Sequence, residues 1–172
     1  MFAPLPIPMT EITPMTSEHW PSVRAIYLAG IVGGNATFEI QVPSWDEWDK
    51  KHLKFARLVA VRDGEVKGWA ALSAVSTRDV YRGVAENSVY VAADAQGLGL
   101  GRRLLEMLIS ESEANGVWML QTSIFPENVP SIRLHLSCGF REVGYRERIA
   151  KLNGVWRNTI FMERRSNTIG AE

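Results

Sequence analysis

The sequence predicts one α/β domain of the α+β type, with about seven strands and four helices in the order βααβββαβαββ. Three observations support this prediction: an Asp-Gly turn between two apolar runs, an Asn-Gly turn between two others, and a glycine-rich turn that leads from an apolar run into a stretch with helical periodicity. A length of 172 residues suits one compact core and is short for two. We therefore expect a single domain over residues 1–172, with an ordered core at about 9–165.

The first third of the chain predicts a strand and two helices. Met9–Thr13 is typical of a short strand. Thr16 or Ser17 then caps a helix that ends at the Gly33-Gly34 pair and whose apolar face is Trp20, Val23, Ile26, Tyr27 and Ile31. Ser44 and Glu47 form a capping box for a second helix, from Trp45 to about Lys54, whose charged face we expect to be solvated.

The remaining elements follow from turn residues and from periodicity. Asp63-Gly64 predicts a hairpin, because Asp-Gly between apolar runs is a strong hairpin signal. The pattern breaks at Ser76–Gly83 and resumes as a strand at Ser88–Val91. The predicted strands of the two hairpins and of the region between them are Leu58–Val61, Val66–Val75, Val117–Ile124, Phe140–Leu152 and Val155–Glu163, and the later helices are Gly99–Asn115 and Pro130–Cys138.

Composition and charge exclude several classes of protein. Hydrophobic residues at 46% and charged residues at 22% argue against wholesale disorder and against a coiled coil. Because 19 basic residues balance 19 acidic ones, we expect neither nucleic acid nor an anionic membrane as a partner. One cysteine, Cys138, excludes an intramolecular disulfide and a cysteine-rich zinc site, so we expect no metal and a reducing, cytoplasmic location.

The apolar runs and the two ends of the sequence add little. No run reaches the roughly 18 apolar residues of a membrane span, and no basic residue precedes Arg24. We therefore expect neither a membrane-spanning segment nor an export signal. Met1–Pro8 and Ser166–Glu172 are expected to be frayed tails.

The glycine-rich turn from Gln96 to Arg102 joins a predicted strand to a predicted helix. Glycines at alternate positions let several backbone N–H groups converge on one anion, and the helix amino terminus adds its positive end. The turn lacks the Gly-Lys-Ser/Thr of a P-loop, and its glycine spacing differs from that of a dinucleotide fingerprint. A tight turn without any ligand is the alternative interpretation.

Two motifs in register resemble the GNAT family of N-acetyltransferases. Gln-x-x-Gly-x-Gly after a strand is similar to that family's acetyl-CoA loop, and the second motif is carried by Asn128, Ser131, Leu134, His135 and Gly139-Phe140. The resemblance covers essentially Met9–Glu163 and implies the GNAT fold, a mixed central sheet flanked by helices. It also implies acetyl-CoA as co-substrate, bound by Val89, Tyr90, Val91, Gln96, Gly97, Leu98, Gly99, Leu100, Gly101, Arg102, Asn128 and Ser131. Helix capping is the alternative role for Asn128 and Ser131.

Within that family, the segment Ala85–Val91 resembles the corresponding segment of the phosphinothricin and methionine sulfoximine acetyltransferases. Further similar segments are Ala36–Glu39, Gly68–Ala70, Ile124–Asn128 and Gly154–Trp156. This resemblance implies acetylation of the α-amine of a small amino acid or analogue, such as phosphinothricin, methionine sulfoximine or methionine sulfone. It also implies a homodimer.

The chemistry of acetyl transfer suggests roles for three residues. An α-amine with a pKa near or above about 8 is largely protonated at neutral pH, so a base must collect its proton. Glu86, at the start of the strand before the glycine-rich turn, matches the residue assigned as general base in the resembling enzymes. His135 either protonates the leaving thiolate or only forms hydrogen bonds in the site. Cys138 has no neighbouring base, so we expect a packed side chain and direct transfer in a ternary complex.

The acceptor pocket is assigned from the same resemblance. Thr37 and Phe38 match a loop that closes over the substrate, and Arg78, Tyr81 and Arg82 precede the strand of Glu86. Arg78 is the preferred partner for a substrate carboxylate, because a guanidinium presents paired donors at carboxylate spacing. Arg82 is equally suited to binding the acceptor and to a surface ion pair. Trp156 is expected to line the pocket or a dimer contact, with burial in the core as the alternative.

Two alternatives stay open. One keeps the fold and the coenzyme but changes the acceptor to a polyamine, an aminoglycoside or a protein N-terminus. The acceptor segment has no acidic cluster that would suit such cations. The other is a non-catalytic CoA-binding sensor, against which the presence of Glu86 argues. His19 and His52, on predicted surface helices, are expected to be solvated.

Overall fold

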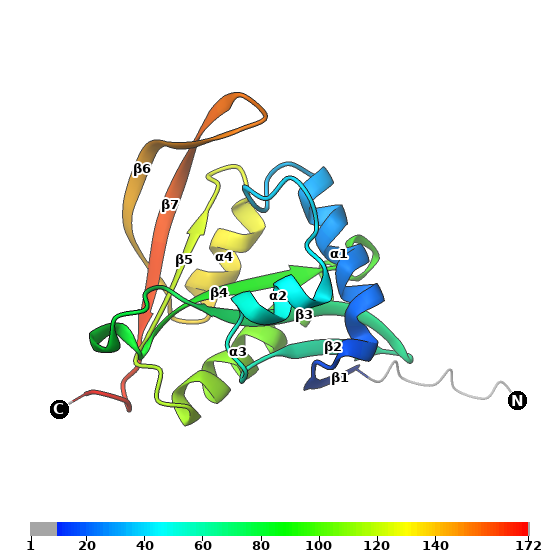
Figure 1. The fold of residues 1–172 in the computed structure, drawn as a ribbon, viewed down its shortest axis with the longest axis horizontal. Helices are drawn as coiled ribbons and strands as arrows, with labels where there is room; N and C mark the ends of the chain where they lie inside the picture. Colours follow the sequence, from blue (N-terminus) through cyan, green and yellow to red (C-terminus); the bar gives the residue numbers. More distant parts are fainter. Residues whose placement is uncertain (1–9, 172) are drawn as a thin grey trace, which may run out of the picture.

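The computed structural model describes residues 10–171, which form a seven-stranded sheet in the order β1-β2-β3-β4-β5-β7-β6 with helices on both faces (Figure 1). The elements follow the predicted order βααβββαβαββ, and the predicted α+β class is confirmed. The strands are β1 (Thr10–Pro14), β2 (Leu58–Arg62), β3 (Glu65–Ala74), β4 (Val84–Val91), β5 (Met119–Ile124), β6 (Arg141–Leu152) and β7 (Val155–Arg165). The helices are α1 (Trp20–Val32), α2 (Trp45–Lys51), α3 (Leu100–Ala114) and α4 (Val129–Ser137), with single 3-10 turns η1 (Ser17–His19), η2 (Asp79–Tyr81) and η3 (Ala93–Ala95).

Alternation along the central strands divides the core between two faces of the sheet. On β3, Trp69 and Ala71 belong to a cluster with Trp48 of α2 and the buried face of α1. The intervening Ala70 and Leu72 pack in the cluster that contains the apolar face of α3. Successive side chains of a strand point to opposite faces, so one strand serves both layers.

The local signals acted as predicted at the hairpins and helix starts. Asp63 and Gly64 have φ values of 52° and 82°, and Asn153 and Gly154 have 49° and 81°, which is the positive-φ pair that a two-residue type I′ turn requires. The Ser44–Glu47 capping box is formed, with the Ser44 N–H donating to Glu47 Oε2 at 2.8 Å. Thr16 is the N-cap residue of the first helical segment, and its backbone N–H donates to Nδ1 of the His19 ring at 3.0 Å.

Most boundaries agree with the predictions to within about two residues, and the larger differences are at the end of α2, at His52 and at the start of β4. Helix α2 ends at Lys51 rather than near Lys54, because the chain turns extended at His52. His52 is not solvated: its ring stacks on Trp48 at 4.0 Å, and Nδ1 lies 2.7 Å from the Trp48 carbonyl oxygen. Strand β4 begins at Val84, four residues before the predicted Ser88, because pairing with β3 and β5 extends the strand beyond its most apolar part.

The two ends of the chain differ in what the structure describes. Met1–Pro8 and Met9 lie outside the described residues. Frayed structure was predicted from Ser166 onward, yet Ser166 is buried, and its backbone N–H donates to the Trp118 carbonyl oxygen at 2.9 Å. Its hydroxyl accepts from the N–H groups of Thr168 and Ile169, so side-chain capping orders this segment.

The feature that creates the site is the separation of β4 from β5. These neighbours are parallel and pair only from Val84↔Met119 to Glu86↔Gln121. Beyond Glu86, β4 continues along β3 as far as Val91, while β5 continues along β7 as far as Ile124. The two strands therefore diverge beyond this pairing, as Figure 1 shows.

The β6–β7 hairpin projects beyond the rest of the molecule (Figure 1). Its exposed apolar side chains include Tyr145, Val155 and Trp156. Within residues 10–171, no helix combines the length and apolar character needed to cross a membrane.

Candidate active site

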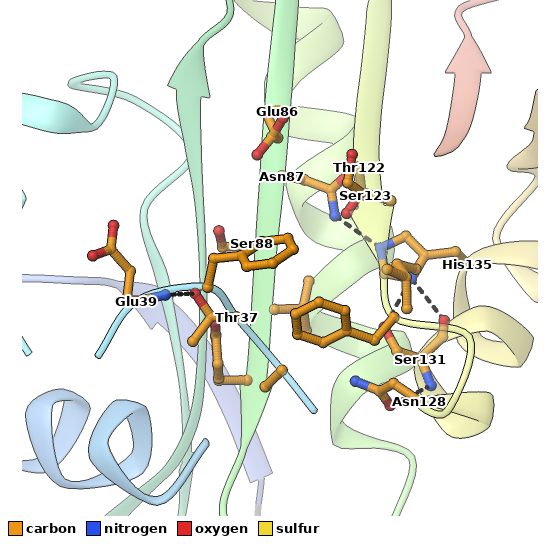
Figure 2. A pocket seen from close by; sticks show the side chains of 16 residues that line it. Thr37, Glu39, Glu86, Asn87, Ser88, Thr122, Ser123, Asn128, Ser131 and His135 are labelled. Carbon is orange, nitrogen blue, oxygen red and sulfur yellow. Dashed lines mark hydrogen bonds between the residues drawn. The ribbon is translucent and has the colours of Figure 1, made fainter. Parts of the chain in front are cut away.

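A pocket of about 260 Å³ occupies the opening between the diverging strands. Figure 2 shows Thr37 and Glu39 on one side of β4, and Asn128, Ser131 and His135 on the other. The walls come from four parts of the chain: the α1–α2 loop, β4, the end of β5 with the residues after it, and α4. The lining residues are Ala36, Thr37, Phe38, Glu39, Glu86, Asn87, Ser88, Val89, Tyr90, Thr122, Ser123, Ile124, Phe125, Asn128, Ser131 and His135.

Glu86 is placed at the point where the strands separate. It is the last residue of β4 that pairs with β5, and its neighbours Ala85 and Asn87 are buried while Glu86 is exposed. Strand alternation therefore turns its carboxylate away from the core, into the pocket. The side chain forms none of the ion pairs found within residues 10–171, so its oxygens are available to a substrate.

His135 is buried, and each of its two ring nitrogens has a hydrogen-bond partner in the protein. Nδ1 lies 2.8 Å from the Ser131 carbonyl oxygen, and Nε2 lies 2.8 Å from Nδ2 of Asn87. A carbonyl accepts only, so Nδ1 carries the proton and Nε2 accepts from the Asn87 amide. Burial lowers the pKa of His135, which favours this neutral tautomer. The ring thus links α4 to β4.

Asn128 and Ser131 lie where α4 begins. Asn128 Oδ1 accepts from the Ser131 N–H at 3.3 Å, which is a helix cap. Asn128 Nδ2 donates to the Asn35 carbonyl oxygen at 3.1 Å. The capping alternative is therefore realised for Asn128, and the same side chain also joins α4 to the α1–α2 loop.

Aromatic side chains close the pocket beside the α1–α2 loop. Phe38 meets Phe125 edge to face, with ring centroids 4.8 Å apart. Tyr90 stacks on Trp69 at 4.7 Å, and burial raises its pKa, so its hydroxyl stays protonated. Tyr27 contacts both rings and belongs to the same layer.

The glycine-rich turn adjoins this pocket along β4 and begins α3. Gly97 and Gly99 have φ values of 74° and 77°, which L side chains rarely adopt, and Gly99 caps the helix. Gly101 is constrained differently, because a Cβ there would lie 3.2 Å from a methyl group of Leu134 on α4. Glycine is thus needed for the backbone path and for close packing of α3 on α4.

The other predicted coenzyme residues of this turn differ in exposure. Gln96 and Leu98 are exposed, whereas Leu100 is buried, so only the backbone of Leu100 is available to a ligand. Arg102 pairs with Glu106 at 2.7 Å. Val89 and Tyr90 line the pocket, and Val91 is half-buried one residue beyond it. The first N–H groups of a helix have no partner within the helix, so the amino end of α3 presents donors suited to a phosphate.

Four predicted acceptor residues do not line the pocket. The guanidinium carbon of Arg78 lies 5.6 Å from the centroid of the Tyr81 ring, and both side chains are exposed. Arg82 pairs with Asp79 at 3.1 Å. This is the surface ion pair that the sequence analysis gives as the alternative to acceptor binding. Trp156 is 52% exposed near the tip of the β6–β7 hairpin, so the alternative in which it packs in the core is wrong. Lys151 lies over its ring.

Several pocket residues carried no signal that the sequence analysis used. Glu39 and Phe125 lie within segments that were recognised by resemblance, but their own roles were not assigned. Asn87 follows Glu86, and only knowledge of which face of β4 meets α4 would have paired it with His135. Thr122 and Ser123 became pocket residues because β5 ends its pairing with β4 at Gln121.

Cys138 ends α4 and is half-buried. Burial raises the pKa of its thiol, so the reactive thiolate is disfavoured. Cys138 is absent from the pocket wall and packs against the core cluster around α3.

Comparison with known proteins agrees with this geometry. The family model described as the acetyltransferase (GNAT) family matches residues 20–140. A phosphinothricin N-acetyltransferase of Alcaligenes faecalis is 35% identical over 153 residues, which are 86% of this chain and 78% of that protein. An L-methionine sulfoximine/L-methionine sulfone acetyltransferase of Salmonella typhimurium is 36% identical over 111 residues, 64% of this chain and 65% of that protein.

Solved structures show the same architecture. A phosphinothricin acetyltransferase from Sinorhizobium meliloti, in complex with acetyl-CoA, superimposes with a TM-score of 0.85 at 28% identity, covering 95% of this chain and 91% of that one. A ribosomal-protein-alanine N-acetyltransferase from Brucella melitensis also gives 0.85, at 32% identity and with 91% and 99% coverage. The predicted GNAT fold is therefore confirmed. From the family match, the relatives and the fold together, the chain belongs to the acetyltransferase (GNAT) family and is an N-acetyltransferase.

Proposed function

We propose that this protein moves the acetyl group of acetyl-CoA to the α-amine of a small amino acid or analogue of the phosphinothricin, methionine sulfoximine or methionine sulfone type. The observation that carries this proposal is the exposed Glu86 carboxylate at the point where β4 and β5 separate, inside a pocket of about 260 Å³. The names of the two curated relatives supply the acceptor class.

Acetyl-CoA is the co-substrate, and it supplies a thioester-activated acetyl group. The N–H groups at the amino end of α3, from Gly97 to Arg102, are suited to its pyrophosphate because the turn glycines remove side chains from the approach. Beyond Glu86, the edge of β4 that faces β5 pairs with no strand of residues 10–171. Its backbone at Val89, Tyr90 and Val91 is therefore available to the amides of an extended ligand.

Glu86 acts as the general base in this proposal. The attacking amine must be neutral, and an exposed carboxylate in the pocket can take its proton directly or through a water molecule. Cys138 lies outside the pocket wall with a raised thiol pKa, which supports direct transfer rather than an acetylated enzyme.

For His135, the hydrogen bonds support the positioning alternative over thiolate protonation. Nε2 carries no proton in the tautomer that satisfies both contacts, and the Nδ1 proton is held by the Ser131 carbonyl. We propose that His135 orients Asn87 in the pocket.

The acceptor carboxylate needs a cation, and no Lys or Arg is among the described residues that line the pocket. Arg78 precedes β4 and forms none of the salt bridges within residues 10–171, unlike Arg82, which pairs with Asp79. These contacts favour Arg78 over Arg82 as the carboxylate partner. Thr37 and Phe38 form the facing wall, and Trp156 is exposed on the projecting hairpin.

A second acceptor class is favoured by one specific comparison. The Brucella melitensis structure is that of a ribosomal-protein-alanine N-acetyltransferase, so a protein N-terminus is the competing acceptor. The exposed pocket face of Glu86 suits either amine.

A thiol-release assay over an acceptor panel tests the proposal. The panel contains phosphinothricin, methionine sulfoximine, methionine sulfone, ordinary amino acids, a peptide with N-terminal alanine, spermidine and an aminoglycoside. We expect the amino-acid analogues to give the highest kcat/KM. Preference for the peptide would support the competing acceptor, and absence of turnover with every amine would support a CoA-binding sensor.

We also propose a homodimer that acts in the cytoplasm. Val155 and Trp156 are 62% and 52% exposed on a hairpin that projects from the domain, and apolar surface of this kind is suited to a subunit contact. Light scattering coupled to size-exclusion chromatography tests the dimer. The single Cys138 fits a reducing compartment.

A further inference from the structure

The α1–α2 loop forms one wall of the pocket without regular backbone structure. Residues 33–44 contain no helix or strand, yet residues 36–39 line the pocket. A segment without ladder hydrogen bonds keeps a fixed position only if other groups satisfy and anchor its backbone. The anchors of this loop therefore decide the shape of the wall.

Arg157 on β7 is the principal anchor. Its Nη1 donates to the Gly34 carbonyl oxygen at 3.0 Å, and its Nη2 donates to Asn35 Oδ1 at 2.7 Å. The same Nη2 lies 3.2 Å from Glu127 Oε2. The Arg157 side chain is only 16% exposed, whereas the side chain of its partner Glu127 is 57% exposed, so the guanidinium is held at the edge of the protein with its charge-assisted contacts.

Arg157 also contacts the opposite wall of the pocket, which is formed by Phe125 and α4. Its guanidinium lies 4.2 Å over the ring of Phe125, which in turn meets Phe38 of the loop. Asn128 adds a parallel link by donating to the Asn35 carbonyl oxygen at 3.1 Å. Three segments distant in sequence, the α1–α2 loop, the β5–α4 turn and β7, thus meet at one guanidinium.

We propose that Arg157 is a positioning residue for acetyl transfer, which sets the distance between the acceptor wall at residues 36–39 and the wall formed by Phe125 and α4. The inference rests on the proposed function, because it assigns the α1–α2 loop to the acceptor. Arginine suits the role since its planar fork donates to two loop acceptors at once while its face stacks on an aromatic ring. Lysine offers a single charged point and no planar face.

The kinetic test compares Arg157→Met, Arg157→Lys and Arg164→Met. Arg164 is a matched control, because it lies on the same strand, is 19% exposed and pairs with Glu113 of α3, and neither of these residues lines the pocket. Arg157→Met should raise the acceptor KM about tenfold or more while the acetyl-CoA KM stays within about twofold. In Arg157→Lys, the acceptor KM should lie between those of the wild type and Arg157→Met. Arg164→Met should leave both KM values unchanged.

Amide hydrogen exchange tests the anchor without using activity. Residues 33–40 should exchange about tenfold faster in Arg157→Met than in the wild type, with exchange in α3 unchanged, and Arg164→Met should show no such local effect. Equal exchange in the loop together with an unchanged acceptor KM would overturn the inference. If the wild type acetylated none of the amino acids, the proposed function would fail, whereas accelerated loop exchange would still support the anchor.

Discussion

Nδ2 of Asn87 lies 2.8 Å from Nε2 of His135, which joins β4 to α4 in the wall of the pocket. Because His135 Nδ1 also donates to the Ser131 carbonyl oxygen, the ring is held as the neutral Nδ1–H tautomer. A protonated ring would present a second N–H to the Asn87 amide nitrogen, which is itself a donor. Protonation of His135 therefore requires either that the contact breaks or that the Asn87 amide turns its Oδ1, which has no partner among the described residues, toward the ring.

This coupling predicts a stability loss on acidification. Burial holds the pKa of folded His135 below its ordinary value of 6.5, so the unfolded chain binds a proton more readily. The contribution is therefore fully present above about pH 6.5 and is lost as pH falls toward the lower folded pKa. Urea unfolding between pH 7.5 and pH 5 should show a shallower pH dependence in His135→Gln than in the wild type.

The residual slope in that variant has a second source. His52 is half-buried against Trp48, and burial lowers its pKa as well. The doubly substituted His52→Gln, His135→Gln chain should therefore be flatter still. Identical slopes in the wild type and in His135→Gln would show that the His135 ring is not held neutral.

Replacing Glu86 tests the general base. Glu86→Gln keeps the shape of the side chain but cannot take a proton, so kcat should fall by about 10² to 10⁴ while acetyl-CoA affinity changes little. Glu39 is the competing carboxylate, since it also lines the pocket. It lies 3.8 Å from Lys51 on α2, so we expect Glu39→Gln to affect kcat far less. A collapse of kcat in Glu39→Gln with wild-type turnover in Glu86→Gln would transfer the role to Glu39.

The glycine-rich turn is tested by two glycines with the same backbone conformation. Gly99 and Gly64 have φ values of 77° and 82°, and a Cβ at either meets nothing within 4 Å. Valine at each position thus carries a similar backbone strain, on the order of 1–2 kcal/mol. Gly99→Val should abolish acetyl-CoA binding in calorimetry, whereas Gly64→Val, at the β2–β3 turn, should retain it. Unchanged affinity in Gly99→Val would remove the turn from the coenzyme site.

Direct transfer predicts that Cys138 is dispensable. Cys138→Ala should keep wild-type turnover, because the thiol is outside the pocket wall and burial raises its pKa. Intact-mass spectrometry of the wild type with acetyl-CoA and no acceptor should show no added acetyl group. A stable adduct that disappears in Cys138→Ala would establish a covalent route instead.

The order of the elements was predictable because its signals are local. Asp63-Gly64 and Asn153-Gly154 set two hairpins, and the Ser44–Glu47 box set the start of α2. The early start of β4 was missed because Val84–Asn87 is a strand only through its pairing with β3 and β5. Burial of His52 was missed for a similar reason, since its partner Trp48 is on the face of α2 that meets the sheet.

The candidate site was predictable where residues of the recognised sequence motifs also line the pocket. Glu86, His135, Asn128, Ser131, Thr37 and Phe38 all line the pocket. Contacts between distant segments were not predictable from periodicity, because they depend on how the loops pack. Arg157 is the clearest example: its partners Gly34 and Asn35 are 123 and 122 residues away.

The acceptor carboxylate gives the sharpest test of substrate class. No cation lines the pocket among the described residues, so an amino acid needs a partner from its surroundings, and Arg78 forms no salt bridge within them. A charge-assisted contact is worth roughly 1.5–3 kcal/mol, so Arg78→Ala should lower kcat/KM about 10- to 150-fold for amino acids. The matching amino-acid amides should lose much less, because they offer no carboxylate. Arg82→Ala is the control, since Arg82 already pairs with Asp79 at 3.1 Å, and it should leave the acid-to-amide ratio unchanged. A general distortion of the pocket would penalise acid and amide alike, so equal losses in Arg78→Ala would refute the carboxylate role.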